Sequence, residues 1–532
     1  MKNLLQIPIV DLFAGPGGLG EGFAAYEDPG FRFRKAISIE KDACAHRTLT
    51  LRTFFRSFGK GCAPKEYYAY LRGEIDLKSL FAVHPEQAAV AQTACLNAEL
   101  GVSAAKMINH RIRNALNGAD WWVLIGGPPC QAYSIVGRSR MRGTPREEFE
   151  KDKRHYLYRE YLRILARFRP PVFVMENVKG LLSARIDGRP VFDQILDDLS
   201  APEQALQSAF GSRRRQGTAR QYRVCSLVVE GDSGDLKPQD YVVYTEKFGI
   251  PQKRHRVILL GVRSDVTRPV GAVLREKPEL RVRTVIGELP RLRSRLSQET
   301  DSPEAWLSAL RCGLEHGLLD CDDRKIETAM RAAVTALTSV PPVGDRFVLK
   351  SRASQFRLGR DWFSDPHLAG FCNHESRPHM RADLYRYLFV FCFGLVKGFS
   401  PRLRSFPPKL LPDHRNVPDA IKEVYGHFSD RFRVQTGTSP AATVTSHIAK
   451  DGHYFIHHDP SQCRSWTVRE AARIQTFPDN YFFEGTRTEQ YRQVGNAVPP
   501  LLAIQIASIV GRIIRANVLE AGNATRRLGA SA

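Results

Sequence analysis

Residues 5–20 read LQIPIVDLFAGPGGLG, an apolar run that passes directly into a cluster of glycines. Leu5–Leu12 has the composition of a buried strand, and Gly15, Gly17, Gly18 and Gly20 precede a predicted helix that ends near residue 25. Glycines at such a turn let the backbone approach a ligand closely. A second strand over residues 33–39 ends at Glu40, whose carboxylate can accept hydrogen bonds from ribose hydroxyls. Since the spacing is not the dinucleotide fingerprint GxGxxG, we predict a nucleoside cofactor without a pyrophosphate.

The same alternation of strands and helices continues to about residue 264. It predicts further strands at 121–126, 171–175, 222–229 and 255–262, with helices at 151–168 and 190–199. This pattern is typical of an α/β protein with a doubly wound, mostly parallel sheet. Residues 265–435 break the rhythm and are rich in proline, arginine and aromatic side chains, so we expect a smaller inserted domain there. Regular structure returns after 436, with a helix over residues 500–516, which divides the chain into 1–264, 265–435 and 436–532.

The composition indicates a protein that binds a polyanion. The 532 residues include 78 Lys and Arg against 56 Asp and Glu, a net charge of +22, and 43% are hydrophobic. Such an excess favours nucleic acid as the partner, with an ordinary solvated basic surface as the alternative. The ten cysteines contain no CxxC pair, which fits a reducing cytoplasm. The run at 387–396 is about half of what a membrane span needs, and no signal peptide is evident, so we expect a soluble protein without a membrane partner.

Two reactive side chains follow strands that are expected to be neighbours. Cys130 lies in GGPPCQAYS (126–134), where two glycines and two prolines hold it on a stiff turn after the strand at 121–126. Glu176 follows the apolar run at 172–175. A free cysteine is usually a small buried hydrophobe and a glutamate at such a place can be a helix cap. A thiol and an acid at one sheet edge also suit covalent catalysis on an electron-poor ring.

A third group of polar residues lies in FGIPQKRHRV (248–257). Because alternate residues of an extended segment face one way, Arg254 and Arg256 are expected in the same cleft, with Gln252 beside them. A pair of this kind is usually surface charge. Placed at the start of a strand, it becomes a candidate anchor for a base or a phosphate.

These motifs together resemble those of the DNA (cytosine-5) methyltransferases of bacterial restriction–modification systems. The glycine turn, GGPPCQAYS, MENV (175–178) and PQKRHR (251–256) are followed, in the family's order, by RSWTVREAARIQTFPD (464–479) and QVGNAVPP (493–500). The resemblance covers roughly residues 5–264 and 440–515. It implies a methyltransferase fold, with residues 265–435 as the target recognition domain and 436–532 returning to the catalytic domain.

The resemblance also implies roles for individual residues. S-adenosylmethionine would be held by Phe13, Ala14, Gly15, Gly17, Gly18, Leu19, Glu40, Asn496 and Ala497, with Phe13 stacked on its adenine and Glu40 on its ribose. Cys130 would attack C6 of a cytosine that has been flipped out of duplex DNA, and Glu176 would hold and protonate N3. Arg256 would contact the O2 atom of the base and Arg254 would support the site. Gln131, Ser134 and Gln252 would face the DNA.

Other interpretations stay open at this stage. The long segment between Glu40 and Trp121 hides the acid that binds the adenine amino group in this family, for which Glu74 and Asp76 are loose candidates. An RNA cytosine methyltransferase is an alternative, although the related tRNA enzymes typically lack so large an insert. A catalytically inert DNA-binding scaffold is a second alternative. His447, His453, His457 and His458 match no common zinc spacing, so we predict no metal site. A cognate restriction endonuclease is the expected partner of such a system.

Overall fold

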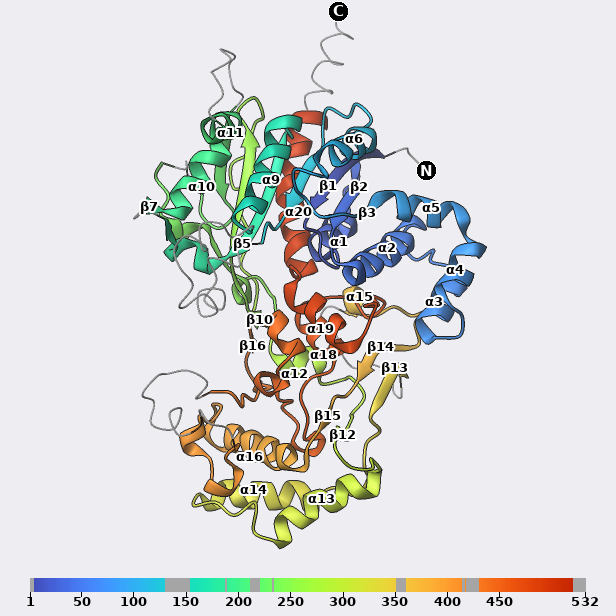
Figure 1. Ribbon diagram of the computed structural model, residues 1–532, viewed down its shortest axis with the longest axis vertical. Coiled ribbons are helices and arrows are strands. Elements are labelled where there is room, and N and C mark those ends of the chain that lie inside the picture. The colour runs from blue at the N-terminus through green and yellow to red at the C-terminus, as the bar shows by residue number, and fades with distance from the viewer. Residues whose placement is uncertain are drawn as a thin grey trace, which may run out of the picture.

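The computed structural model describes residues 4–129, 154–186, 189–210, 221–231, 234–350, 360–413, 417 and 430–519. A large sheet and its covering helices form one end of the molecule, and a helical body with α13, α14 and α16 forms the other (Figure 1). Helices α12, α18 and α19 lie between the two ends. The last long helix, α20, runs back up beside the sheet, so the end of the chain completes the half of the molecule in which the chain began.

The large sheet has the strand order β3-β2-β1-β4-β5-β11-β8, and β9 also pairs with β11. Neighbouring strands from β3 to β5 are parallel, whereas β11 runs antiparallel to β5, β8 and β9. This confirms the predicted doubly wound, mostly parallel sheet. The strands are β1 (Leu5–Leu12), β2 (Phe31–Glu40), β3 (Cys95–Asn97), β4 (Val123–Gly126), β5 (Val172–Val178), β8 (Tyr222–Ser226), β9 (Val242–Tyr244) and β11 (His255–Arg263).

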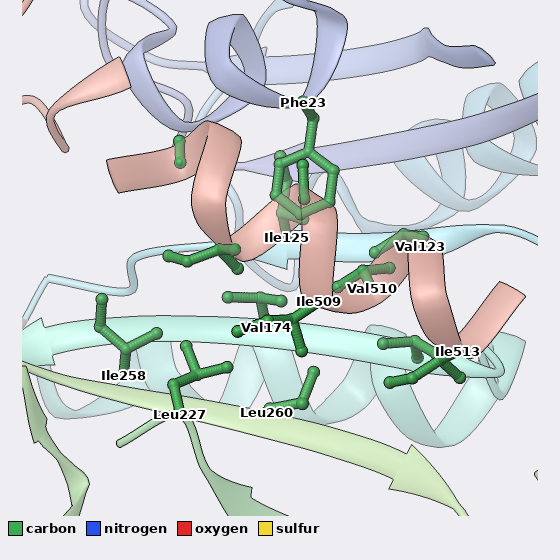
Figure 2. Packing of buried hydrophobic residues seen from close by; sticks show 14 of the residues in the cluster. Phe23, Val123, Ile125, Val174, Leu227, Ile258, Leu260, Ile509, Val510 and Ile513 are labelled. Carbon is green, nitrogen blue, oxygen red and sulfur yellow. The ribbon is translucent and has the colours of Figure 1, made fainter. Parts of the chain in front are cut away.

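The central strands are apolar throughout because helices cover both faces of the sheet. Alternate residues of β4 and β5, such as Ile125 and Val174, face α20 and α1, while Leu124, Phe173 and Met175 face the opposite core. Figure 2 shows Ile509, Val510 and Ile513 of α20 packed with strand residues of the first core. The covering helices are α1 (Gly18–Ala25), α6 (Ala105–Leu116), α9 (Arg154–Phe168), α10 (Val191–Ser200), α11 (Pro202–Phe210) and α20 (Pro500–Ile514).

A helical insertion separates β2 from β3 in the chain. It follows α2 (Ala43–Ser57) and consists of α3 (Lys65–Arg72), α4 (Leu77–Val83) and α5 (Pro85–Ala94). Tyr67 and Leu80 of the insertion share an apolar core with Phe54 of α2 and with Cys372 and Phe482 from the second half of the chain. The insertion therefore packs against α2 and also against segments from the second half of the chain.

The remaining elements form the helical body and the region that joins it to the sheet. A core containing Trp306, Met330 and Leu388 holds α13, α14 and α16 together. These elements are α12 (Val282–Ile286), α13 (Pro303–Glu315), α14 (Arg324–Thr335), α15 (Arg360–Phe363), α16 (Arg381–Lys397), α18 (Val468–Ile474) and α19 (Arg487–Asn496). Short pairs of strands join these elements: β10 (Gln252–Lys253) with β16 (Ala441–Ala442), β12 (Arg295–Leu296) with β15 (Pro378–His379), and β13 (Gly344–Leu349) with β14 (Gly370–Glu375). A further short pair, β6 (Arg185–Ile186) with β7 (Arg189–Pro190), lies between β5 and α10 in the chain.

Two observations bear on organisation and on the membrane. A further core joins Val282 and Ile286 of α12 to Trp466 and Val494, so apolar packing crosses the predicted boundary at residue 435, which stays a prediction. In the part of the chain that the structure describes, the stretch Arg487–Val518 is long and apolar enough to span a membrane by length and composition, and 67% of its apolar window is buried. This stretch includes α20, whose apolar side is the sheet-covering surface.

Candidate active site

The glycine turn lies at the carboxyl end of β1, where β2 and β4 flank it on opposite sides. This is the switch point at which open α/β sheets bind ligands. Phe13, Gly15 and Gly17 have φ of 56°, 57° and 97°, so the backbone turns through the left-handed region three times before α1 begins. Only glycine adopts this conformation freely, and the positive φ of Phe13 is the kind of local strain that clusters at ligand sites.

The glycines of this turn differ in what surrounds them. A Cβ at Gly18 would lie 2.2 Å from the carbonyl oxygen of Val498, and one at Gly22 would lie 2.3 Å from the Cβ of Ala503. Both glycines therefore let α1 pack directly on the chain that leads into α20. A Cβ at Gly15, by contrast, would meet nothing within 4 Å. The turn thus has one side closed by the C-terminal segment and one side open for a ligand.

Glu40 and Asn496 lie on the borders of this turn. The Glu40 carboxylate accepts the N–H of Gly15 at 2.8 Å and the N–H of Asp42 at 2.7 Å, which fixes its position. Each carboxylate oxygen has a second lone pair, so both can still accept ribose hydroxyls. Asn496 is exposed and Ala497 is buried against Gly18, which brings QVGNAVPP to the glycine turn. The residues present fit a nucleoside cofactor such as S-adenosylmethionine.

Glu176 and Arg256 form an ion pair at the next edge of the sheet. Arg256 Nε lies 2.8 Å from Glu176 Oε1, and both side chains are only about one-seventh exposed, at 14% and 15%. In the antiparallel β5–β11 pair, Arg256 is opposite Val178 and Ile258 is opposite Glu176, so the two side chains lie on one face of the sheet. Burial lowers the pKa of Arg256 and the Glu176 carboxylate opposes that shift.

The turn that carries the predicted nucleophile begins beside Glu176. Gly126 of β4 pairs with Met175 of β5, and a Cβ at Gly127 would lie 3.0 Å from Glu176 Oε2. Asn177 Nδ2 donates to the carbonyl of Pro128 at 3.5 Å. Cys130 follows two residues later and lies outside the described residues, as do Gln131 and Ser134. The described part of GGPPCQAYS therefore reaches the carboxylate as predicted, and the thiol itself stays a prediction.

Arg254 and Gln252 are buried behind this edge rather than exposed on it. Arg254, 2% exposed, donates to the carbonyls of Val444 and Gly495 at 2.6 and 3.2 Å, so it ties β11 to the C-terminal segment beside Asn496. Burial lowers the pKa of Arg254 well below its usual value, and the nearby Arg256 adds to the shift.

Gln252 differs from its predicted place at the DNA. Its side chain is fully buried, its Nε2 donates to Gln475 Oε1 at 2.6 Å, and its Oε1 accepts the N–H of Val444 at 3.0 Å. With both ends of the amide used internally, Gln252 has no face left for a DNA contact in this arrangement. Gln252 lies on an extended segment, but β10 is covered by β16 and by the end of α18, so the segment is not exposed.

The structure also locates the strand that the sequence pattern missed. β3 is only three residues long and pairs with β2, where Asn97 is opposite Glu40 and donates to the Glu40 carbonyl at 2.9 Å. Glu74 instead pairs with Arg72, and Asp76 caps α4 through the N–H of Ser79. Both acids line a surface groove with Arg346. The loose assignment of Glu74 or Asp76 to the adenine therefore has no support from their placement.

In the histidine-rich stretch His457 is buried, His453 and His458 are partly buried, and His447 is exposed. His457 Nε2 lies 3.4 Å from Glu470 Oε1, and the His457 ring stacks on His458. A hydrogen bond of 2.7 Å joins His453 Nδ1 to the hydroxyl of Tyr387. Among the residues that the structure describes, no group of three or more His, Cys, Asp or Glu side chains is arranged to hold a metal ion.

Comparison with known proteins gives consistent matches along the chain. Residues 92–202 and 381–512 match the C-5 cytosine-specific DNA methylase family. The chain is 32% identical to the type II methyltransferase M.Bpa9945I of Bacillus paralicheniformis, over 95% of this chain and 99% of that protein. It is 27% identical to the type II methyltransferase M.AgeI of Thalassovita gelatinovora, over 94% and 98% of the two chains. It is 28% identical to the DNA (cytosine-5-)-methyltransferase M.ApeKI of Aeropyrum pernix, over 75% and 83%.

Proposed function

Because this chain belongs to the C-5 cytosine-specific DNA methylases, a family of DNA (cytosine-5-)-methyltransferases, we propose that it methylates a flipped-out cytosine through a covalent adduct with Cys130. The cytosine would lie within a short specific sequence of duplex DNA. One observation carries the proposal: the Glu176–Arg256 pair, 2.8 Å apart, lies beside the start of the turn that leads to Cys130. An acid and a guanidinium held together at one sheet edge match the N3 and O2 atoms of a cytosine.

The residues of the glycine turn hold the methyl donor in this proposal. Phe13 and Ala14 face the adenine, Gly15, Gly17, Gly18 and Leu19 line the methionine end, Glu40 accepts the ribose hydroxyls, and Asn496 and Ala497 close the pocket. When bound, S-adenosylmethionine supplies an electrophilic methyl group for C5 of the base. The open space at Gly15 and the spare lone pairs of Glu40 support this assignment.

The chain's own side chains prepare the base for that transfer. Cytosine C5 is a poor nucleophile until C6 carries an adduct, so the Cys130 thiolate forms a bond to C6 while Glu176 donates a proton to N3. Arg256 contacts O2, and Arg254 holds the end of α19 at Gly495 in place behind it. After C5 is methylated, its proton passes to solvent water, the C5–C6 double bond re-forms, the S–C6 bond breaks to release the Cys130 thiolate, and N3 returns its proton to Glu176.

The biological setting follows from the relatives and is part of the proposal. Type II methyltransferases work in restriction–modification systems, so we assign the chain to such a system, with a cognate endonuclease as partner and the cytoplasm as its place of action. We assign DNA recognition to the region within 265–435, where basic side chains such as Arg281, Arg291 and Arg402 supply phosphate-binding charge.

A methyl-transfer assay tests the proposal directly. The full chain is incubated with plasmid DNA and labelled S-adenosylmethionine, and the product is sequenced after bisulfite treatment. We expect methylcytosine at one short repeated sequence. Cys130→Ser should abolish transfer and keep DNA binding. Transfer to tRNA and not to DNA would overturn the DNA substrate, and retained transfer by Cys130→Ser would overturn the covalent mechanism.

A further inference from the structure

A short segment between α18 and α19 joins the glycine turn to three other parts of the molecule. This junction segment, residues 478–484, comes from the C-terminal part of the chain and is buried except near its end. Arg469 of α18 donates to the carbonyls of Pro478 and Tyr481 at 3.0 and 2.7 Å, which fixes the course of its backbone. The side chains of the junction segment are therefore held at fixed positions.

On one side the junction segment contacts the glycine turn. The hydroxyl of Tyr481, which is fully buried, donates to the carbonyl of Pro16. The same hydroxyl lies 3.1 Å from the position that a Cβ would take at Gly17. A shift of the junction segment would therefore move the turn between β1 and α1.

Asn480 connects the junction segment to the first helices. Arg52 of α2 donates to Asn480 Oδ1 at 2.9 Å and to Glu21 of α1 at 2.6 Å. Glu21 and Arg52 are 0% and 3% exposed, so this charge pair is shielded from water. The guanidinium also lies over the rings of Phe55 and Tyr481, at 4.2 and 4.8 Å from their centroids. One end of Asn480 is thus linked, through Arg52 and Glu21, to the helix that begins at the glycine turn.

The other end of Asn480 reaches the region assigned to DNA recognition. Asn480 Nδ2 donates to Asp365 Oδ2 at 2.7 Å, and Tyr68 of the helical insertion donates to the same oxygen at 2.8 Å. The backbone carbonyl of Asn480 accepts the hydroxyl of Tyr67 at 3.0 Å. The result is a chain of hydrogen bonds from Glu21 through Arg52, Asn480 and Asp365 to Tyr68.

Such a chain makes the positions of its members depend on one another. Glu21, Arg52, Asn480 and Tyr68 are buried, Asp365 is partly buried, and each polar group is bonded to the next. Moving Asp365 therefore leaves the Asn480 amide N–H without its acceptor, and moving Arg52 leaves the Asn480 amide oxygen without its donor. A ligand that holds α1 in place therefore favours the same arrangement as a ligand that holds the region around Asp365. Two sites that favour one arrangement of a shared element strengthen each other's binding.

We propose that Asn480 is a positioning residue that couples cofactor binding at the glycine turn to DNA binding by the region that contains Asp365. The inference rests on the proposed function and adds to it a route between the two sites. The helical insertion α3–α5 serves as the brace that holds the recognition side of this route through Tyr67 and Tyr68.

The test compares the affinity for S-adenosylhomocysteine with and without a duplex that contains the methylated sequence. Titration calorimetry on the full chain gives the ratio of the two dissociation constants. We expect a ratio of about 5 or more for the unmodified chain, within the usual range of coupling between sites. In Asn480→Ala the ratio should fall to within about twofold of one, and Asp365→Ala, which removes the acceptor at the other side of the same link, should do the same.

Tyr70→Phe is the matched control. Tyr70 lies on the same helix as Tyr67 and donates to Glu484 at the end of the junction segment, outside the route through Arg52. A purely structural role for Asn480 would lower both affinities and the melting temperature equally in the variant and leave the ratio unchanged. An unchanged ratio in either folded variant, or no coupling in the unmodified chain, overturns this inference while methyl transfer stands. Absence of S-adenosylhomocysteine binding in the unmodified chain overturns the proposed function as well.

Discussion

Arg256 Nε lies 2.8 Å from Glu176 Oε1 across the antiparallel pair of β11 and β5, at the edge where the parallel strands end. The two residues are 80 positions apart in the sequence, and each follows the register of its strand. Because both side chains are mostly buried, water competes little with the ion pair between them. In the proposed function a bound cytosine would insert between them or share their hydrogen bonds, which makes the pair the first target for mutation.

Replacing Glu176 by glutamine keeps the size of the side chain and removes the acidic proton that the proposed mechanism transfers to N3. We expect Glu176→Gln to lower kcat for methyl transfer by about 100-fold or more, because general acid catalysis contributes on the order of 10²–10⁴. Binding of DNA and cofactor should change little. The initial rate of transfer to plasmid DNA, measured at saturating substrate, checks this.

Glu246→Gln is the control for that variant. Glu246 is half-buried, and its Oε1 lies 2.9 Å from Nε2 of His255, the residue that precedes Arg256 in β11. Its loss should leave kcat within about a factor of two, since a rim charge acts mainly on association. Equal losses in both variants would contradict a specific role of Glu176.

The glycine turn predicts opposite outcomes for two similar substitutions. In Gly18→Ala the new methyl group would lie 2.2 Å from the carbonyl oxygen of Val498, so α1 and the lead into α20 must separate. We expect a loss of about 3 kcal/mol or more of unfolding free energy, at the upper end of overpacking effects. Denaturant unfolding followed by circular dichroism measures it.

Gly15→Ala meets no atom within 4 Å but must keep a φ of +57°. We expect a cost of about 1–2 kcal/mol from the left-handed backbone alone. Its larger effect should be on the cofactor, because the methyl group enters the open side of the turn beside Glu40. Unfolding and S-adenosylhomocysteine titration on one preparation separate the two effects, and a cofactor affinity equal to that of the unmodified chain would contradict the position of the ligand.

Local patterns predicted the sheet well because the relevant signals are short. The apolar runs at Leu5–Leu12 and Val172–Val178 and the glycines that follow β1 reflect burial on both faces and a tight turn, which few other structures require. The proximity of Glu176 to the start of the Cys130 turn also followed, since parallel neighbours end at one edge.

The failures involve contacts that no local pattern contains. β3 has three residues and its pairing with β2 depends on the packing of an insertion, so it carries no periodic signal. Gln252 is buried by β16 and Gln475, which lie about two hundred positions further along the chain. The same holds for Asn480. This residue and its partners Arg52 and Asp365 come from three separate parts of the sequence.

A buried ion pair in the C-terminal segment sets a clear expectation for stability. Arg464 donates to both oxygens of Glu470 at 2.7 Å, and their side chains are 0% and 1% exposed. Removing one partner leaves the other charge buried, so Glu470→Gln should cost about 3–5 kcal/mol. Glu299→Gln, which breaks the exposed pair with Arg381, should cost about 0–1 kcal/mol. Equal midpoints for the two variants in a denaturant titration would contradict the contribution of the buried pair.

Asp11, at the end of β1, predicts how stability depends on pH. Its carboxyl group is 1% exposed, and burial raises its pKa to about 7, although Lys35 opposes the shift and Glu40 adds to it. Between about pH 4 and pH 7 the folded protein therefore retains a proton that the unfolded chain has released. The contribution of Asp11 to stability must then decrease as pH rises through this window and level off above it.

Asp11→Asn removes that titration and nearly preserves the shape of the side chain. The variant also removes the attraction between Asp11 and Lys35, which in the unmodified protein opposes the rise in the pKa of Asp11. The absolute melting temperatures of the two proteins therefore matter less than their slopes. Melting curves at half-unit steps from pH 5 to pH 8 should show the unmodified chain losing stability faster than Asp11→Asn, with the curves becoming parallel above pH 7. Curves that are parallel throughout would mean that Asp11 is already ionised at pH 5, and that Lys35 compensates for its burial.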